Sequence, residues 1–214
     1  MITFNFDQKF ETVILANGSF PKRAVLLKAL QNCQNLVCCD GAVDQLICSG
    51  VQKQPSAVIG DMDSVSSSAR TQFANQCISV SDQNTNDLEK ALIYCQQKNW
   101  LTILVLGAAG LREDHFLGNF SLLLTYGQKM DLVLATETAN FIVVQTEMNF
   151  EAPIGTSVSL FASSPEVVLT TQGLQWELQK QNLSTLHSGI LNRTTNTQFC
   201  VKSENGPTVV CVNR

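Results

Sequence analysis

Two aspartates follow a short apolar run in the segment Gly60-Asp61-Met62-Asp63-Ser64. The run before them, residues 57–59, predicts a buried strand, so both acids stand where that strand ends. Residues i and i+2 of an extended segment face the same way, and Asp61 and Asp63 could therefore hold one hard cation such as Mg²⁺ between them. A solvated acidic turn is the competing interpretation of an isolated Asp-x-Asp pair.

Carboxylates recur at the predicted ends of strands and starts of helices. Those outside the Asp-x-Asp pair are Asp40, Asp82, Asp87 and Asp114. Asp87 and Asp114 could be no more than helix caps, and Asn86 with Glu89 three residues later resembles a capping box. Six carboxylates at one edge would repel one another unless cations are present, and Mg²⁺ carried in with a polyphosphate would supply that compensation.

A loop of small residues, Gly107-Ala108-Ala109-Gly110, separates a predicted strand from a predicted helix. Small residues let backbone N–H groups approach a phosphate, and the start of a helix favours negative charge. Arg112, just beyond the loop, can form charge-assisted hydrogen bonds to phosphate oxygens. His115 is either a polar residue of the first helical turn or a substrate contact. The loop is not a P-loop, because the chain contains no Gly-Lys dipeptide.

Apolar strand-like runs alternate with helical patterns between residues 12 and 135, which predicts a mainly parallel, Rossmann-like α/β sheet with flanking helices. The predicted strands are residues 12–16, 35–39, 57–59, 77–80, 101–106 and 130–135. Helical periodicity is clearest over residues 88–95 and 116–124. Small or acidic residues follow nearly every strand, starting with Asn17 and Gly41, and a parallel sheet brings these turns to one edge.

After about Ala139 the runs become short and rich in Val, Thr and Phe. They occupy residues 141–144, 157–161, 166–170, 199–202 and 208–212. This spacing predicts a C-terminal antiparallel β-sandwich, whose small core would need to dock on the first domain or on a second copy of the chain. The predicted domains are therefore residues 1–138 and 139–214.

The composition indicates a compact globular protein, since 44% of its 214 residues are hydrophobic and 15% are charged. The net charge is −4 and no Lys/Arg run occurs, which argues against a nucleic-acid partner. The longest apolar runs are far too short for a membrane span, and the N-terminus does not resemble a signal peptide. We therefore expect a cytoplasmic protein without a membrane partner.

Eight cysteines are scattered through the chain, without a Cys-x-x-Cys pair. A disulfide framework suits short secreted chains, whereas these cysteines fall among core-like residues and predict reduced, mostly buried thiols. A zinc site is a further alternative, but His115 and His187 are the only histidines and no paired ligand spacing occurs.

Five segments, in this order along the chain, together resemble the thiamine pyrophosphokinase family. They are Asp40-Gly41-Ala42, Gly60 to Ser64, Asp82 to Leu92, Gly107 to Asn119, and Gly173-Leu174-Gln175-Trp176-Glu177-Leu178. The resemblance implies transfer of the terminal diphosphate of ATP to the hydroxyl of thiamine, giving AMP and thiamine diphosphate. It also implies a catalytic nucleotide-binding α/β domain, a thiamine-binding β-sandwich and a homodimer with thiamine bound between the subunits.

The resemblance further implies roles for single residues. Asp61, Asp63 and Asp87 would hold Mg²⁺, with Asp40 and Asp82 close by, and all five would be catalytic residues. ATP and its phosphates would be bound by Asn17, Gly41, Gly107, Gly110, Arg112, Asp114, His115 and Asn119. Thiamine would stack on Trp176 by cation–π attraction and contact Asn192 and Thr194. Without the resemblance, Trp176 would be interpreted as an anchor of the sandwich.

The chain departs from the family pattern at several positions. Ala42 and Leu111 stand where the family usually has glycine, Asn86 where it usually has Thr, and Asn84 where it often has Asp. The late Ser/Thr-Ser-Asn stretch of the family matches loosely around residues 192–196.

Our hypothesis is in-line attack of the thiamine hydroxyl on the β-phosphorus of ATP, with Asp82 or Asp40 taking the hydroxyl proton. The rival enzyme is a metal-dependent phosphohydrolase that uses Asp61 as its nucleophile, because an apolar strand before Asp-x-Asp also occurs in that class. Outside the enzymes, the alternative is a non-catalytic thiamine or nucleotide sensor.

Overall fold

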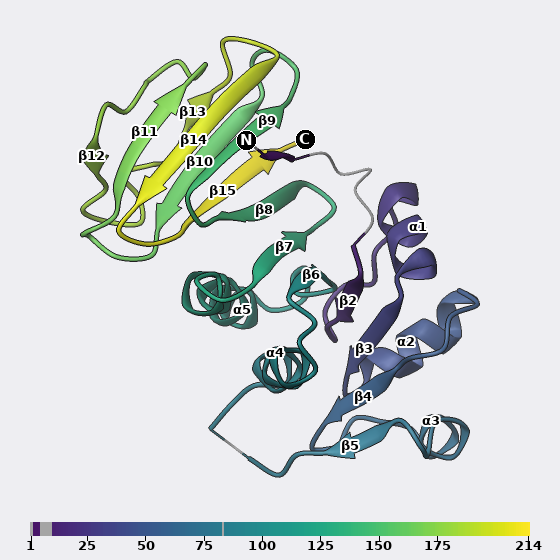
Figure 1. Cartoon of the computed structure of the whole chain (residues 1–214). Coiled ribbons are helices and arrows are strands. Elements are labelled where there is room, and N and C mark those ends of the chain that lie inside the picture. The colour runs from purple at the N-terminus through teal and green to yellow at the C-terminus, as the bar shows by residue number, and fades with distance from the viewer. Residues whose placement is uncertain (1, 5–9, 83) are drawn as a thin grey trace. The chain divides into compact units, whose positions relative to one another are not determined.

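The computed structural model describes residues 2–4, 10–82 and 84–214, which fall into two compact units (Figure 1). Within the described residues, the first unit contains residues 10–122 and 134–137, and the second contains residues 2–4, 123–133 and 138–214. The division falls within helix α5 (Glu113–Tyr126) and strand β7 (Asp131–Ala135).

The first unit is built from parallel strands and helices that alternate along the chain. Its strands are β2 (Thr12–Leu15), β3 (Asn35–Cys39), β4 (Ala57–Gly60), β5 (Cys77–Ser79) and β6 (Thr102–Leu106). Its helices, besides the start of α5, are α1 (Ala24–Asn32), α2 (Ala42–Ser49), α3 (Ser67–Gln72) and α4 (Asp87–Gln97). Figure 1 shows α1, α2 and α3 on one side of these strands and α4 on the other.

The strand order of this unit creates a topological switch point. Strand β2 pairs with β3, β3 with β4 and β4 with β5, so the chain steps outward in one direction. It then returns to the other side of β2, where β6 pairs in parallel. Open α/β sheets bind their ligands outside the carboxyl ends of strands at such a reversal.

The core of the first unit explains why its strands read as continuous apolar runs. Strands β2, β3 and β4 are buried along their whole length, because helices cover both faces. Helix α4 packs on β3 and β4 with a buried apolar stripe that includes Leu88, Leu92 and Cys95. The side chain of Asn86 accepts the Glu89 N–H at 2.8 Å, which confirms that Asn86 caps this helix.

The second unit contains two sets of short strands. In one, β8 (Ala139–Val144), β10 (Ser157–Ala162), β13 (Asn192–Arg193) and β15 (Thr208–Asn213) pair antiparallel in the order β13-β10-β15-β8. The other has the order β1-β9-β14-β11-β12, with bounds β1 (Ile2–Phe4), β9 (Glu147–Glu151), β11 (Val168–Gln172), β12 (Gln181–Asn182) and β14 (Gln198–Glu204). Phe150 and Phe199, directly opposite on β9 and β14, stack with ring centroids 4.7 Å apart.

The predicted fold class is confirmed, with parallel strands among helices followed by a largely antiparallel β region. Strands β1, β9, β12 and β13 and helices α1 to α3 had no counterpart among the predicted elements. Strands β12 and β13 span two residues each and pair with longer neighbours, so a residue pattern of their own is lacking. Strand β1 pairs with β9 in parallel, unlike the other ladders of this unit.

The described cysteines form no disulfide, and five of them, including Cys39 and Cys95, are buried. Burial raises the pKa of Cys95 to about 12, so this thiol stays protonated at neutral pH. The prediction of reduced, mostly buried thiols is confirmed. No helix among the described residues is long and apolar enough to cross a membrane.

Candidate active site

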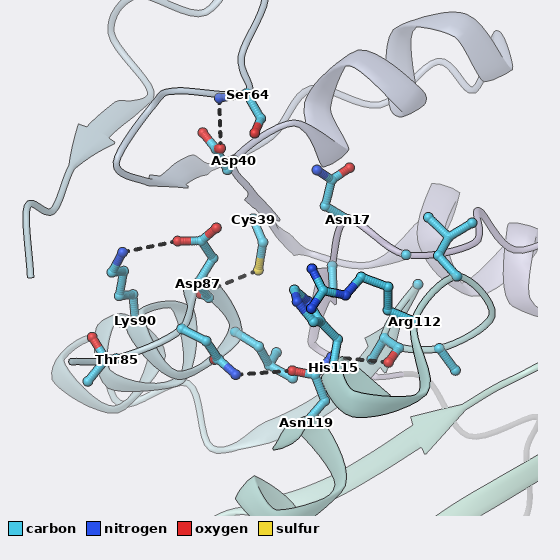
Figure 2. Close-up of a pocket in the computed structure, with 18 of the residues that line it drawn as sticks. Asn17, Cys39, Asp40, Ser64, Thr85, Asp87, Lys90, Arg112, His115 and Asn119 are labelled. Atoms are coloured by element: carbon cyan, nitrogen blue, oxygen red, sulfur yellow. Dashed lines mark hydrogen bonds and ion pairs between the residues drawn. The ribbon is translucent and has the colours of Figure 1, made fainter. Parts of the chain in front are cut away.

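A pocket of about 400 Å³ lies where the carboxyl ends of β2, β3, β4 and β6 meet the starts of α4 and α5 (Figure 2). The residues predicted to form a site that do line this pocket are Asn17, Asp40, Asp61, Asp87, Gly107, Arg112, His115 and Asn119. Those predicted for the same site that are not among the lining residues are Gly41, Asp63, Asp82, Gly110 and Asp114. Residues from five separate loops therefore converge on one cavity.

Asp40 is the most buried acid of the pocket, at 3% exposure. Its Oδ2 accepts the backbone N–H of Ser64 at 3.0 Å, whereas its Oδ1 is buried without a hydrogen-bond partner. Burial raises the pKa of Asp40, and the negative charges of Asp87 and Asp61 raise it further, against the lowering effect of the bond from Ser64. The site thus holds a buried carboxyl group with one unpaired oxygen.

The Asp-x-Asp pair lies in a turn rather than in an extended strand. Strand β4 ends at Gly60, and Met62 has a φ of 72° with its side chain 7% exposed. Within this turn the Asp63 N–H donates to Asp61 Oδ1 at 3.1 Å. The expected strand alternation is therefore not found: Asp61 lines the pocket, whereas Asp63 is exposed beside it.

Helices α2 and α3 brace this acidic turn from outside. Arg70 of α3 donates from its guanidinium to the carbonyl oxygens of Met62 and Val65. Asp44 of α2 accepts the N–H and the hydroxyl of Ser66, the residue that caps α3. The turn that carries Asp61 is consequently fixed by charged side chains that do not themselves line the pocket.

Two glycine-containing loops meet at the switch point between β2 and β6. The Gly18 N–H donates to Gly107 O at 2.6 Å, and the Ser19 N–H donates to Ala109 O at 2.8 Å. A Cβ on Gly18 would come within 2.3 Å of Gly107 O, so this approach requires glycine. Gln45 of α2 donates to the amide oxygen of Asn17 at 2.8 Å, which leaves the Asn17 NH₂ group to donate to an anion.

Arg112 and Asp114 form an ion pair at the start of α5, with Arg112 Nε donating to Asp114 Oδ1 at 3.0 Å. The pair lowers the pKa of Asp114 to about 2 and raises that of Arg112. Arg112 lines the pocket whereas Asp114 does not, and both side chains of the pair are exposed. His115 lines the pocket from the same helical turn and donates its backbone N–H to Asp114.

Asn119 joins two walls of the pocket through both ends of its amide. Its NH₂ group donates to Ala108 O at 3.1 Å, and its oxygen accepts from the Asn86 amide at 3.3 Å. This residue therefore ties the glycine loop after β6 to the cap of α4. Gly110, in the same loop, has a φ of 92° and packs against the Ser19 side chain.

Lys90 and Cys39 line the pocket but were not among the predicted site residues. Lys90 Nζ pairs with Asp87 Oδ1 at 3.1 Å, and the Cys39 thiol donates to the Asp87 carbonyl at 3.5 Å. Lys90 lies three residues after Asp87 on a helix, a spacing that brings two side chains together and could have identified the pair. Lys90 was not predicted as a site residue because its neighbours on this helix are mostly apolar and buried.

Asp82 lies outside the pocket wall in an exposed turn. Its carboxylate accepts the Asn84 N–H at 2.9 Å and the Thr85 hydroxyl at 2.8 Å. These bonds lower the pKa of Asp82, with that from the Asn84 N–H the larger cause. Asp40 and Asp82 are the two residues considered as proton acceptors. The pKa of Asp40 is raised, whereas the pKa of Asp82 is lowered.

Within the described part of the chain, no group of three His, Cys, Asp or Glu side chains is arranged to hold a metal ion. The hard oxygens of Asp40, Asp61 and Asp87 nevertheless face one pocket, and Asp40 Oδ1 is buried and unpaired. Mg²⁺ is usually held by one or two carboxylates together with substrate phosphates rather than by an all-protein cage. The residues present fit a site made of one or two carboxylates together with substrate phosphates.

The residues predicted to contact thiamine lie together in the second unit. Trp176 is 54% exposed, and its backbone is held at both ends by Asn192, which accepts the Trp176 N–H at 3.1 Å and donates to its carbonyl at 2.7 Å. Thr194 is buried, donating its hydroxyl to Pro153 O at 2.7 Å. An exposed indole on a fixed backbone can stack on a flat cation.

Two family models match nearly the whole chain in sequence order. The model of the thiamin pyrophosphokinase catalytic domain matches residues 26–134, and that of the thiamin pyrophosphokinase substrate-binding domain matches residues 139–210. The pocket residues from Cys39 to Asn119 fall within the first match.

The chain is also similar to individual thiamine pyrophosphokinases. Thiamine pyrophosphokinase 1 of Oryza sativa subsp. japonica is 27% identical over 201 residues, covering 80% of this chain and 75% of that protein. Thiamine pyrophosphokinase 1 of Arabidopsis thaliana is 25% identical, covering 80% and 74%. The solved structure of thiamin pyrophosphokinase from Candida albicans shares the fold, with a TM-score of 0.79, 18% identity, and coverage of 97% of this chain and 90% of the other.

Proposed function

Because the chain belongs to the thiamin pyrophosphokinase family, we propose that it transfers a diphosphate group from ATP to the hydroxyl of thiamine, giving thiamine diphosphate and AMP. The observation that carries this proposal is the convergence of Asp40, Asp61 and Asp87 with a glycine loop and Arg112 in one pocket. In this pocket, carboxylates that suit a hard cation lie beside donors that suit phosphate.

We assign the attack to the thiamine hydroxyl and the proton acceptor to Asp40. The hydroxyl attacks the β-phosphorus in line, the bond from that phosphorus to the oxygen of AMP breaks, and the hydroxyl proton passes to the carboxylate. Asp40 is preferred to Asp82 because it lines the pocket, has an unpaired Oδ1 and has a raised pKa. Asp82 is exposed, and its pKa is lowered.

The polyphosphate would be held by donors from three loops. Arg112, oriented by Asp114, supplies charge-assisted bonds, and the Asn17 NH₂ group lies on the opposite loop. Gly41, Gly107 and Gly110 would keep the backbone close to the phosphates, with His115 and Asn119 completing the wall. Positioning and charge neutralisation would supply most of the rate, since phosphoryl transfer needs little covalent help from protein.

Mg²⁺ is the cofactor that we propose, held by Asp61 and Asp87 with Asp63 at the rim. When bound with ATP, it would neutralise phosphate charge and the mutual repulsion of these acids. The convergence of Asp40, Asp61 and Asp87 on one pocket supports such a cation.

We propose that residues 1–138 form the catalytic domain and residues 139–214 the thiamine-binding domain, in line with the two matched models. Trp176 would stack on thiamine, and Asn192 would fix the Trp176 backbone. Thr194 would hold the segment at Pro153, to whose carbonyl it donates. A homodimer fits the exposed apolar side chains of this region, including Ile154, Leu186 and Leu191. A cytoplasmic location stays a prediction, as does the absence of a nucleic-acid partner.

A product assay with ATP, thiamine and Mg²⁺, omitting each in turn, tests the proposal. We expect thiamine diphosphate and AMP in equal amounts, only when all three are present. Formation of AMP without added thiamine, or release of phosphate at a rate that does not depend on thiamine, would contradict transfer. Light scattering of the purified protein, with and without thiamine, measures whether it is a dimer.

The two other functions considered are less well supported. A phosphohydrolase with Asp61 as nucleophile would form a phosphoaspartate and would not need thiamine, and the matched families do not favour it. A non-catalytic sensor would bind thiamine or ATP without turnover under any metal. The product assay separates both from the transferase.

A further inference from the structure

A buried lysine lies inside the proposed site and has no role in the steps above. The side chain of Lys90 is 5% exposed, and lysine is almost never so buried unless it is paired. Its Nζ pairs with Asp87 Oδ1 at 3.1 Å, one turn earlier on α4. Figure 2 shows the two side chains reaching toward each other at the pocket that both residues line.

With the proposed Mg²⁺ bound, two cations would compete for the carboxylate of Asp87. Its carboxylate is among those proposed to hold Mg²⁺, yet one of its oxygens is bonded to the Lys90 ammonium. The charge of Asp87 extends across the pocket, since it contributes to the raised pKa of Asp40. A divalent cation at the paired oxygen would displace the ammonium, which would then need another acceptor.

The geometry points to Lys90 as a catalytic residue that exchanges partners: its ammonium neutralises Asp87 in the nucleotide-free protein and donates to the phosphates of ATP when a divalent cation occupies Asp87. This inference rests on the proposed function. A polyphosphate in the pocket offers several acceptor oxygens, and an ammonium with three donors suits phosphate as a compact point charge. In this exchange Lys90 transfers no proton and forms no covalent bond.

Partner exchange has a signature that a structural lysine lacks. Loss of the ammonium should tighten metal binding to the nucleotide-free protein, because a competing cation is gone. The same loss should weaken the binding of metal-free ATP, because a positive charge beside the phosphates is gone. A lysine that only supports the fold would change neither, or weaken both.

The test compares Lys90→Met, which keeps the length and apolar stem, with Lys98→Met, an exposed lysine next to the last residue of the same helix. Mn²⁺ binding is measured by electron paramagnetic resonance without nucleotide, and ATP binding is measured in EDTA by displacement of a fluorescent ATP analogue. For Lys90→Met we expect about tenfold tighter Mn²⁺ binding and about tenfold weaker ATP binding. We also expect a kcat lower by about 100-fold, with Lys98→Met unchanged. Mn²⁺ binding that is unchanged or weaker in Lys90→Met would overturn the inference.

A labelling experiment on the wild-type protein covers the case in which Lys90→Met does not fold. A lysine amine beside the phosphates attacks the acyl carbon of an acyl-phosphate derivative of ATP. The bond from that carbon to the phosphate oxygen breaks, ATP leaves, and the nitrogen loses a proton as the amide forms. Mass spectrometry should find Lys90 acylated, and more so with Mg²⁺ present. Acylation confined to other lysines would overturn the inference.

Failure of the proposed function can be told apart from failure of this inference. If the wild type makes thiamine diphosphate but Lys90→Met binds Mn²⁺ as Lys98→Met does, the exchange is wrong and the transferase assignment stands. If the wild type makes no thiamine diphosphate, the proposed function fails and the exchange falls with it.

Discussion

The backbone N–H of Ser64 donates to Asp40 Oδ2 at 3.0 Å and so joins the end of β3 to the acidic turn after β4. The other oxygen of Asp40 is buried without a hydrogen-bond partner. One carboxylate thus has both a structural bond and an unused acceptor that faces the pocket. This relationship underlies three of the predictions that follow.

Asp40→Asn should lower kcat by about 100-fold or more, because an amide oxygen can still accept from Ser64 but cannot take a proton. The acidic limb of kcat/KM against pH, which reports the raised pKa of Asp40 in the free enzyme, should disappear in this variant. Asp82→Asn is the comparison, since that carboxyl is exposed and its pKa is lowered. A larger loss in Asp82→Asn than in Asp40→Asn would assign the proton acceptor to Asp82.

Asp40 should also make the folded protein less stable as pH rises. Its pKa is raised in the fold above the ordinary value of 3.8, so between these two values the folded state binds more protons than the unfolded state. The free energy of unfolding therefore falls across this window, and the loss is complete above the raised pKa. Urea unfolding from pH 3 to pH 7 should show this fall in the wild type relative to Asp40→Asn. A difference between the two proteins that is constant with pH would contradict the shift.

Gly60→Ala should destabilise the protein and impair catalysis together. A Cβ at residue 60 would lie 2.8 Å from the Cβ of Asp40, so Asp40, which accepts a hydrogen bond from Ser64, would have to shift. We expect a loss of about 1–3 kcal/mol, as is typical of overpacking in a core, with a fall in kcat. Gly50→Ala is a control for conformational strain, because nothing lies near its added Cβ although its φ is 73°. Wild-type kcat in a folded Gly60→Ala protein would show that the position of Asp40 is unimportant.

The strands of this region could be predicted from the sequence, whereas the conformations of single residues could not. The strands that end at Cys39 and Gly60 were predicted, because an apolar run buried on both faces is visible in the chain. The turn after this second strand was predicted as well, but the positive φ and the burial of Met62 within it were not, since the pattern Asp-x-Asp does not reveal them. The pairing of Arg112 with Asp114 is a matter of side-chain conformation, which spacing leaves open.

Asp61→Asn and Asp63→Asn should separate the two acids of the turn. Both should lower turnover strongly if both hold Mg²⁺ with the polyphosphate, and the fold should persist because neither acid is buried. Asp61 lines the pocket, so its variant should lose about 100-fold or more in kcat and need more Mg²⁺ for half-maximal rate. Glu11→Gln, an exposed acid outside the site, is the control. Near-normal AMP release by both variants would remove the turn from the metal site.

Trp176→Ala should raise the KM for thiamine by about tenfold and leave the KM for ATP nearly unchanged. The indole is 54% exposed, so little core packing is lost, whereas a stacked cation would lose an attraction of about 1–2 kcal/mol. Trp176→Phe should recover part of this loss because phenylalanine keeps an aromatic face. Asn192→Ala should mimic Trp176→Ala in part, since it frees the backbone that Asn192 bonds at both ends. Equal increases in the KM for both substrates would indicate a general disturbance of the protein rather than a thiamine contact.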